Sequence, residues 1–389
     1  MALPLSYNVR SVRVRWQVSL LAVIGIALVV AVFVALMAMR TGFTLALRAT
    51  GLPGNAMVVQ RGSASELTSW VPLEHRNKIL ADPRLATGAD GRALGSPELV
   101  IVGSMPRRTD GLPTYVTIRA VTARAFELRG DIEIEQGRRF APGLDEVMVG
   151  TGIASRIRGL ELGSTISIQR HDWRIVGLFT SRGNAHESEI WGDLSTMAAP
   201  FKQEGGSSSL VVRLRDPADL EAFDAWIQQD PEMQLEAIDE RQYYDEQAGS
   251  LSNTLLFLVS FVSVTMGVGA VFGAMNTMHT IVAARTREIG TLRALGFSRT
   301  SILSTFVVES ALLALAGGLL GCALALPING LGTASGQTPS FSEVAFAFRV
   351  TPEILLCGLA FAAAMGFVGG LLPALRGARM PITSAIREP

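Results

Sequence analysis

The sequence predicts a multi-pass α-helical membrane protein, with four transmembrane helices and a large α+β extracytoplasmic domain on a helical stalk. Three observations predict this class. The chain is 49% hydrophobic and 17% charged, with a mean hydropathy of +0.34, whereas soluble domains average about 25% charged residues. Four apolar runs are long enough to cross a bilayer. Between the first two runs the pattern changes to the period-two alternation of strands.

Each apolar run satisfies the requirement of roughly 20 residues for a membrane-spanning helix. The runs are 18–39, 251–284, 302–327 and 354–375. Asn276 and His279 interrupt the second run, and Glu309 interrupts the third. The first run is longer than the roughly 7–15 apolar residues of a signal-peptide core, and no small-residue cleavage site follows it. We therefore expect it to be retained as an anchor.

Basic residues near the ends of the runs predict the orientation. They are Arg10, Arg13 and Arg15 before the first run, Arg285, Arg287, Arg293 and Arg299 between the second and third, and Arg376, Arg379 and Arg387 after the fourth. Cytoplasmic loops carry an excess of Lys and Arg. We therefore expect all three groups, and both termini, on the cytoplasmic side. Residues 40–250 and the loop 328–353 then lie on the opposite side.

The pattern divides the chain into three parts. Residues 1–40 hold the N-terminus and first span, 41–250 the outer domain with its stalk helices, and 251–389 three spans and a short helix at 284–297. We expect stalk helices at 40–50 and 238–249. Within the outer domain we expect strands at 115–121, 164–169, 173–179 and 209–215, helices at 73–81, 150–158 and 218–229, and a flexible loop at 205–209.

Residues that carry chemistry are sparse. The sequence contains no HExxH, GxSxG or GxxxxGK[ST] motif, and its two cysteines, Cys322 and Cys357, lie inside predicted spans. Histidines of the outer domain show no metal-ligand spacing. His171 and Asp172 could form a general-base pair, but a solvated turn between strands is the interpretation we prefer. We predict no catalytic residue, no metal site and no cofactor bound by this chain, and hence no enzyme.

Three stretches together resemble one family. Residues 285–296 read RTREIGTLRALG, residues 309–321 read ESALLALAGGLLG, and residues 373–387 read PALRGARMPITSAIR. These stretches, and the order of spans and outer domain, resemble the MacB/FtsX-like permeases of ABC transporters, the mechanotransmission type. Family members named MacB carry a fused ATPase domain. The resemblance implies that here the ATPase is a separate cytoplasmic subunit.

The resemblance implies a bacterial inner-membrane permease that couples ATP hydrolysis to motion of its periplasmic domain. Its partners would be two copies of an ABC ATPase holding ATP and Mg²⁺, a second copy of the permease, membrane lipids and, for efflux, a periplasmic adaptor (membrane fusion) protein with an outer-membrane duct. No nucleic acid is implied. Efflux or export of a substrate is the expected output. Lipoprotein release, and regulation of a periplasmic cell-wall hydrolase without transport, are the alternatives.

The resemblance also implies that the helix at 284–297 docks on the ATPase. The residues implied are Arg285, Arg287, Glu288, Ile289, Gly290, Leu292, Arg293, Leu295 and Gly296. Helical spacing predicts an apolar side formed by Ile289, Leu292 and Leu295, and an ion pair between Arg285 and Glu288. Gly296 suits a helix C-cap and Ser298 an N-cap. Alternatively, the arginines only satisfy the orientation rule and contact anionic lipid.

Two further features lie inside the spans. Glu309 is an intramembrane acid, which is a functional candidate by default. We prefer a hydrogen-bonded packing role for it over a proton relay, because no second acid or base lies in the spans. The GxxxG spacings of Gly269 with Gly273 and of Gly317 with Gly321 allow close helix packing and fit a homodimer.

Overall fold

A computed structural model describes residues 16–335 and 344–380. The chain forms two compact units. The bundle unit contains the residues up to Thr41, Asn253–Leu331 and those from Phe348 onward, and the sheet unit contains Gly42–Ser252 and Gly332–Ala347. The predicted cytoplasmic residues Arg10, Arg13, Arg15 and Arg387 lie outside the described residues.

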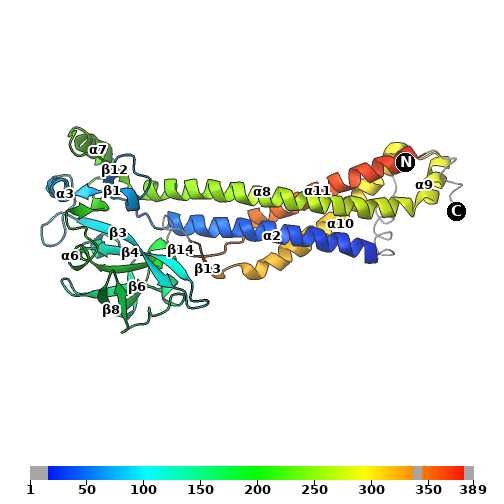
Figure 1. Cartoon of the computed structure of the whole chain (residues 1–389). Coiled ribbons are helices and arrows are strands. Elements are labelled where there is room, and N and C mark those ends of the chain that lie inside the picture. The colour runs from blue at the N-terminus through cyan, green and yellow to red at the C-terminus, as the bar shows by residue number, and fades with distance from the viewer. Residues whose placement is uncertain (1–15, 336–343, 381–389) are drawn as a thin grey trace. The chain divides into compact units, whose positions relative to one another are not determined.

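Four long helices form the bundle unit (Figure 1). They are α2 (Trp16–Arg48), α8 (Glu240–Ala283), α10 (Arg299–Ala325) and α11 (Pro352–Arg379). Each is long and apolar enough to cross a membrane, with mean hydropathies between 2.2 and 3.2 over their most apolar windows. One apolar core contains side chains from all four helices. The four predicted spans are confirmed as helices.

Small residues bring α10 close to its neighbours in the bundle. A Cβ placed on Gly321 would lie 2.5 Å from the Ala27 carbonyl oxygen of α2, and one on Gly317 would lie 2.9 Å from Val23 O. These two glycines therefore serve close helix packing within one chain, as predicted, and the homodimer that their spacing also fits stays a prediction. In contrast, a Cβ on Gly269 or Gly273 of α8 meets no described atom within 4 Å.

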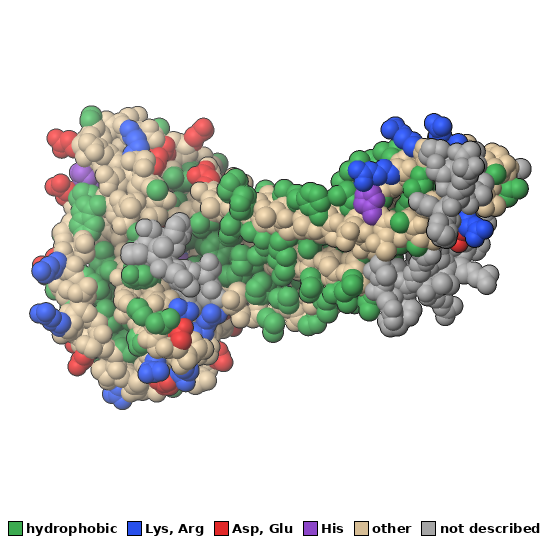
Figure 2. Space-filling view, turned by 45° about the vertical axis from the view of Figure 1, so that its right-hand side comes forward, with side chains coloured by type: hydrophobic (Ala, Val, Ile, Leu, Met, Phe, Trp, Pro, Cys, Tyr) green, Lys and Arg blue, Asp and Glu red, His purple; other side chains and the backbone are tan. Residues whose placement is uncertain are grey.

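Apolar side chains also cover the outside of the bundle, as Figure 2 shows. On α8, Phe257, Phe261 and Phe272 are 74%, 63% and 61% exposed. An apolar surface of this extent is unusual for a protein in water. It is the surface expected of helices that face lipid.

The sheet unit is built on one ten-stranded sheet, with the order β12-β1-β11-β3-β4-β9-β6-β8-β5 and with β7 paired to β8. Its strands are β1 (Asn55–Gln60), β3 (Gly95–Pro106), β4 (Pro113–Val121), β5 (Glu133–Gly137), β6 (Glu146–Gly150), β7 (Thr165–Ile168), β8 (His171–Thr180), β9 (Glu189–Asp193), β11 (Ser209–Arg213) and β12 (Leu235–Asp239). The pairs β4–β9 and β6–β8 are parallel, and the other pairs are antiparallel. This mixed sheet confirms the α+β prediction.

Short helices complete the sheet unit. They are α3 (Leu73–Leu80), α4 (Ala125–Leu128), α5 (Thr151–Ala154), α6 (Leu194–Met197) and α7 (Leu220–Gln228), with 3-10 turns η1 (Glu66–Thr68), η2 (Ala185–Ser188) and η3 (Pro217–Asp219). Helices expected at 73–81 and 218–229 are confirmed. The one expected at 150–158 is shorter: Gly150 still belongs to β6, and α5 ends at Ala154 with Ser155 as its C-cap. Phe223 and Ile227 of α7 are fully buried against the sheet.

The expected flexible loop at 205–209 is wrong. Gly206 and Ser207 form β10, which pairs with β2 (Val71–Pro72), and both residues are buried. A Cβ on Gly206 would lie 2.4 Å from the Val71 carbonyl oxygen. Glycine is therefore needed there for close backbone approach, and its presence does not indicate flexibility.

The segment between α10 and α11 contributes to the sheet unit. After the 3-10 turn η4 (Leu326–Ile328), strands β13 (Gly332–Ser335) and β14 (Val344–Ala347) pair as a hairpin. The Ala345 N–H donates a hydrogen bond to Ser188 Oγ at 2.7 Å. Phe346 meets Phe43 edge to face, with ring centroids 5.4 Å apart. The hairpin is thus part of the sheet unit's packing.

Two helices continue from one unit into the other. α2 ends at Arg48, and α8 begins at Glu240 directly after β12 ends at Asp239. The expected stalk helices at 40–50 and 238–249 are therefore present, except that the second starts two residues later because 235–239 pairs with β1.

Candidate functional site

A short helix separates the second and third long helices of the bundle unit. This helix, α9 (Thr286–Ala294), follows a break at Arg285, where φ is −117° and ψ is 12°. It ends at Ala294, and Gly296, two residues further on, has a φ of +95°, the left-handed conformation that glycine adopts at low cost. Ser298 Oγ then accepts a hydrogen bond from Ser301 N and caps α10. Both predicted caps are confirmed.

Arg285, the residue at the break, forms hydrogen bonds to side chains of α9 and α10. Its Nε donates to Glu288 Oε2 of α9 at 3.1 Å, and its Nη1 donates to Glu309 Oε2 of α10 at 2.9 Å. The guanidinium carbon also lies 5.6 Å from the centre of the Phe306 ring. Arg285 is 5% exposed and Glu309 is 1% exposed. The Glu309 carboxylate is thus buried and hydrogen-bonded, in keeping with the packing role that we preferred, and Arg285 is the ion-pair partner that sequence reasoning missed.

The inward side of α9 packs on the bundle. Ile289 is 3% exposed and lies in a cluster with residues of α8, α10 and α11. Gly290 is buried beside it. Arg293 Nη1 donates to the Ala378 carbonyl oxygen in the last turn of α11 at 2.8 Å, where a cation is favoured by the helix dipole. α9 is therefore attached to the long helices α10 and α11.

The outward side of α9 carries Arg287 and Glu288, and Leu295 follows directly after the helix; all three are exposed. Leu295 is 73% exposed. The predicted apolar side is therefore divided: Ile289 points into the bundle, Leu292 is half-buried, and Leu295 faces out. A shallow pocket between α9 and α10 is lined by Arg285, Glu288, Ile289, Leu292, Ile302, Thr305 and Phe306.

Further basic side chains surround this end of the bundle, as Figure 2 shows. The exposed ones are Arg287, Arg299, Arg376 and Arg379. Arg376 Nη1 also lies 3.4 Å from His279 Nε2. The surface offers cationic groups around one exposed apolar side chain, which is a pattern suited to a protein partner with acidic groups around an apolar hollow.

Metal-ligating side chains, and the pair of His171 with Asp172, are the other candidates among the described residues. No group of three His, Cys, Asp or Glu side chains in them is arranged to hold a metal ion. His171 is the first residue of β8 and lies 3.0 Å from Asp145, and the turn before it is formed by Gln169 and Arg170 with positive φ. His171 and Asp172 therefore lie next to each other on strand β8. The turn that we expected them to form is formed by the two residues before them.

The long apolar helices, the α+β sheet unit inserted after the first of them, and the short basic helix after the second define a multi-span membrane protein. Family comparison identifies it as a permease. The MacB-like periplasmic core domain matches residues 19–230, and the FtsX-like permease C-terminal domain matches residues 260–382. The chain therefore belongs to the MacB/FtsX-like family of ABC transporter permeases, and the resemblance in the sequence is confirmed.

Individual relatives are distant. The chain is 28% identical over 248 residues to an uncharacterized ABC transporter permease of Methanocaldococcus jannaschii, covering 62% of this chain and 61% of that protein. It is 27% identical over 332 residues to the macrolide export ATP-binding/permease protein MacB of Agrobacterium fabrum, covering 78% and 49%. A solved periplasmic region of MacB from Actinobacillus actinomycetemcomitans is 10% identical, with a TM-score of 0.37 over 51% of this chain and 93% of that one. The chain thus spans about half to three fifths of the length of these two curated relatives.

Proposed function

We propose that this chain is the permease subunit of an ABC transporter in a bacterial inner membrane. Two copies would work with two copies of a separate cytoplasmic ATPase, and ATP hydrolysis there would drive motion of the sheet unit on the periplasmic side. Both termini and α9 would face the cytoplasm. One observation carries the proposal: α9 presents Leu295 and cationic groups outward while buried contacts hold it to α10 and α11.

The attachment of α9 favours docking over a simple orientation signal. Arginines that only oriented the chain and contacted lipid would need no buried partner. Arg285 and Arg293 instead bind Glu309 and the end of α11. A load on the exposed side of α9 would therefore reach two long helices, because a capped helix of nine residues is stiffer than a loop.

The names of the relatives support the proposal that the partner is an ATPase. The Agrobacterium protein is named as both ATP-binding and permease, and this chain covers 49% of it. We propose that the ATP-binding function resides on another polypeptide here, with ATP and Mg²⁺ bound there. That relative is also named for macrolide export, and we propose export or efflux as the output, with a periplasmic adaptor and an outer-membrane duct as partners. Drug, lipid, peptide and lipoprotein remain the cargo classes to distinguish.

The test is affinity purification of the tagged full chain in mild detergent, followed by identification of the proteins that accompany it. We expect an ABC ATPase to co-purify with the wild-type chain and to be lost with Leu295→Asp. Leu331→Asp is the matched control, since Leu331 is 57% exposed in the same unit and lies beyond α10. Ile289 is unsuitable for this experiment because its substitution would disrupt the bundle core.

Three outcomes are informative. Loss of the ATPase with Leu295→Asp alone supports docking on α9, and a co-purifying adaptor supports efflux. An ATPase retained by Leu295→Asp would place docking elsewhere. If the wild-type chain retains no ATPase in any detergent, the proposal is wrong and α9 is a membrane-surface helix.

A further inference from the structure

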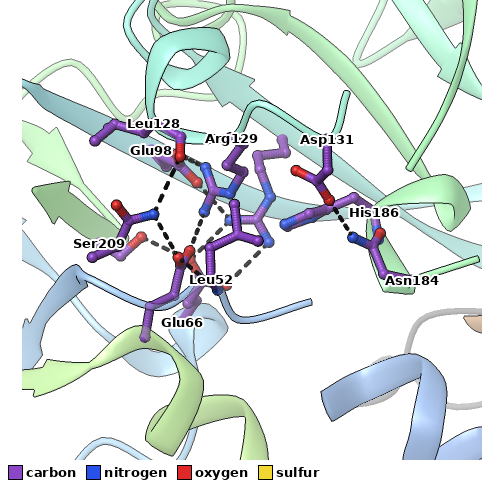
Figure 3. Close-up of polar contacts among 12 residues, drawn as sticks. Leu52, Glu66, Glu98, Leu128, Arg129, Asp131, Asn184, His186 and Ser209 are labelled. Atoms are coloured by element: carbon purple, nitrogen blue, oxygen red, sulfur yellow. Dashed lines mark hydrogen bonds and ion pairs between the residues drawn. The ribbon is translucent and has the colours of Figure 1, made fainter. Parts of the chain in front are cut away.

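A buried network of charged side chains lies in the sheet unit where α8 begins. Figure 3 shows Glu66, Glu98 and Arg129 turned toward one another in its centre. Its charged members are Arg119, Arg129, Glu66, Glu98, Glu189 and Glu240, none more than 6% exposed. Charges are almost never this deeply buried without partners. The question is what these contacts position.

Glu240, the first residue of α8, is held by three groups. Its Oε1 accepts a hydrogen bond from Arg129 Nη2 at 2.9 Å. Its Oε2 accepts from Asn55 Nδ2 of β1 at 2.8 Å and from the Leu52 N–H at 3.3 Å. Leu52 lies shortly after the end of α2. One carboxylate therefore ties the start of α8 to β1, to the segment after α2 and to Arg129.

Arg129 and Arg119 extend the contact into the sheet. Arg129 Nη1 donates to Glu98 of β3, and Arg119 Nη1 of β4 donates to the other oxygen of Glu98 at 2.8 Å. Arg119 Nε then donates to Glu189 of β9 at 2.8 Å. An unbroken chain of charged hydrogen bonds thus runs from the first residue of α8 through three neighbouring strands, β3, β4 and β9.

The chemistry of the network suits fixed geometry more than stability. Burial alone would raise the pKa of Glu189, but Arg119 and His186 hold that pKa below its ordinary value, so the carboxylate remains ionised. Buried ion pairs add little net stability relative to well-packed apolar residues, because desolvation offsets attraction. They are directional, however, and a charge-assisted hydrogen bond tolerates little displacement of its partners.

We infer that Glu240 and Arg129 are positioning residues that fasten the start of α8 to the central strands, so that movement of α8 is passed to the sheet. The backbone agrees, since β12 ends at Asp239 and α8 starts at the next residue with no loop between them. A flexible connection there would absorb movement instead. The inference rests on the proposed function, because it assigns the path by which movement of the bundle reaches the sheet unit.

The first experiment tests the fastening in the full chain. Spin labels are placed at Glu246→Cys on α8 and Ser167→Cys on β7, both exposed positions, after Cys322→Ala and Cys357→Ala remove the native thiols. We expect a single narrow distance peak in the otherwise wild-type protein, and loss of that peak to a broad distribution with Glu240→Gln. A peak that stays equally narrow overturns the inference.

One control separates positioning from general damage. Glu189→Gln removes a carboxylate of similar burial that binds Arg119, His186 and Trp191 but not α8. It should destabilise the fold while leaving the distance peak narrow. Broadening equal to that of Glu240→Gln would mean a merely structural role and would refute the inference. Should Glu240→Gln fail to fold, Asn55→Ala removes one of its donors and is expected to broaden the same peak.

The second experiment separates this inference from the proposed function. Distances between equivalent labels of the two copies, at position 246 and at position 167, are measured in the complex with the ATPase, with and without a non-hydrolysable ATP analogue. In the wild-type background, both inter-copy distances should shift when the ATP analogue is added. With Glu240→Gln, the distance at position 246 should still shift and the distance at position 167 should not. If neither shifts in the wild type, the proposed function fails, and the transmitting role with it. If both still shift with Glu240→Gln, the inference alone fails.

Discussion

Replacing Glu309 by leucine should destabilise the bundle through the charge it leaves behind. The side chains of Glu309 and its partner Arg285 are 2% and 6% exposed, with 2.9 Å between Oε2 and Nη1. Breaking such a buried pair by removing one partner costs about 3–5 kcal/mol. Arg285 keeps Glu288 at 3.1 Å, but that side chain is 57% exposed, and an exposed pair contributes only about 0–1 kcal/mol. We expect Glu309→Leu to lower the free energy of unfolding by about 3 kcal/mol, at the lower end of that range.

The assay is equilibrium unfolding of the purified chain in mixed micelles of increasing denaturing-detergent content, applied to a double-mutant cycle. Arg285→Met alone should also destabilise, whereas the double variant with Glu309→Leu should return to within about 1–2 kcal/mol of wild type, because two apolar groups replace the pair. Glu353→Gln, an exposed acid in the first turn of α11, is the control and should change little. A cost below about 1 kcal/mol for Glu309→Leu, or additive losses in the double variant, would refute the reasoning.

Three further predictions use the same preparation. Gly321→Val should cost roughly 1–3 kcal/mol by overpacking against Ala27, whereas Gly269→Val should not destabilise the single chain; equal losses in the unfolding assay would contradict this. Ser298→Ala should lower the free energy of unfolding by about 1 kcal/mol through the lost cap of α10. Wild-type stability in that variant would show that the cap does not contribute to stability. Because the folded-state pKa of Glu189 lies below its ordinary value of 4.5, its stabilisation is present above that pH and lost as pH falls below it. Glu189→Gln should therefore weaken the dependence of stability on pH in the acid range, measured by monitoring unfolding through tryptophan fluorescence. The same pH dependence in the variant and the wild type would exclude this role.

Sequence patterns predicted the parts of the fold in which one physical signal dominates. Long apolar runs identify the four membrane helices, because a helix satisfies all its backbone hydrogen bonds within one such run in lipid. Strict alternation identifies β4 and β8. β9 was not predicted, since all five of its residues, Glu189–Asp193, are buried and no alternation remains. The strand at Gly206–Ser207 was mistaken for a loop because glycine and serine can mark either close backbone approach or flexibility.

The candidate site divides in the same way. The pair of Arg285 with Glu288 follows from spacing on one helix, three residues apart. The pair of Arg285 with Glu309 depends on how α9 folds back on α10, over 24 residues, and no local pattern encodes it. Arg129 and Glu240 are 111 residues apart. In sequence, such residues are indistinguishable from the solvated charges of any surface, so the buried network becomes visible only in three dimensions.

The hairpin β13–β14 affects the order in which the protein can be made. The first segment of the sheet unit ends at Ser252, and the ribosome must add about 80 further residues before it reaches Gly332, where the hairpin begins. At roughly 5–20 residues per second, this delay is about 4–16 s. During that time Ser188 lacks the Ala345 N–H and Phe43 lacks the Phe346 ring. The sheet unit therefore emerges from synthesis unfinished, and its final packing must wait until the third span has left the ribosome.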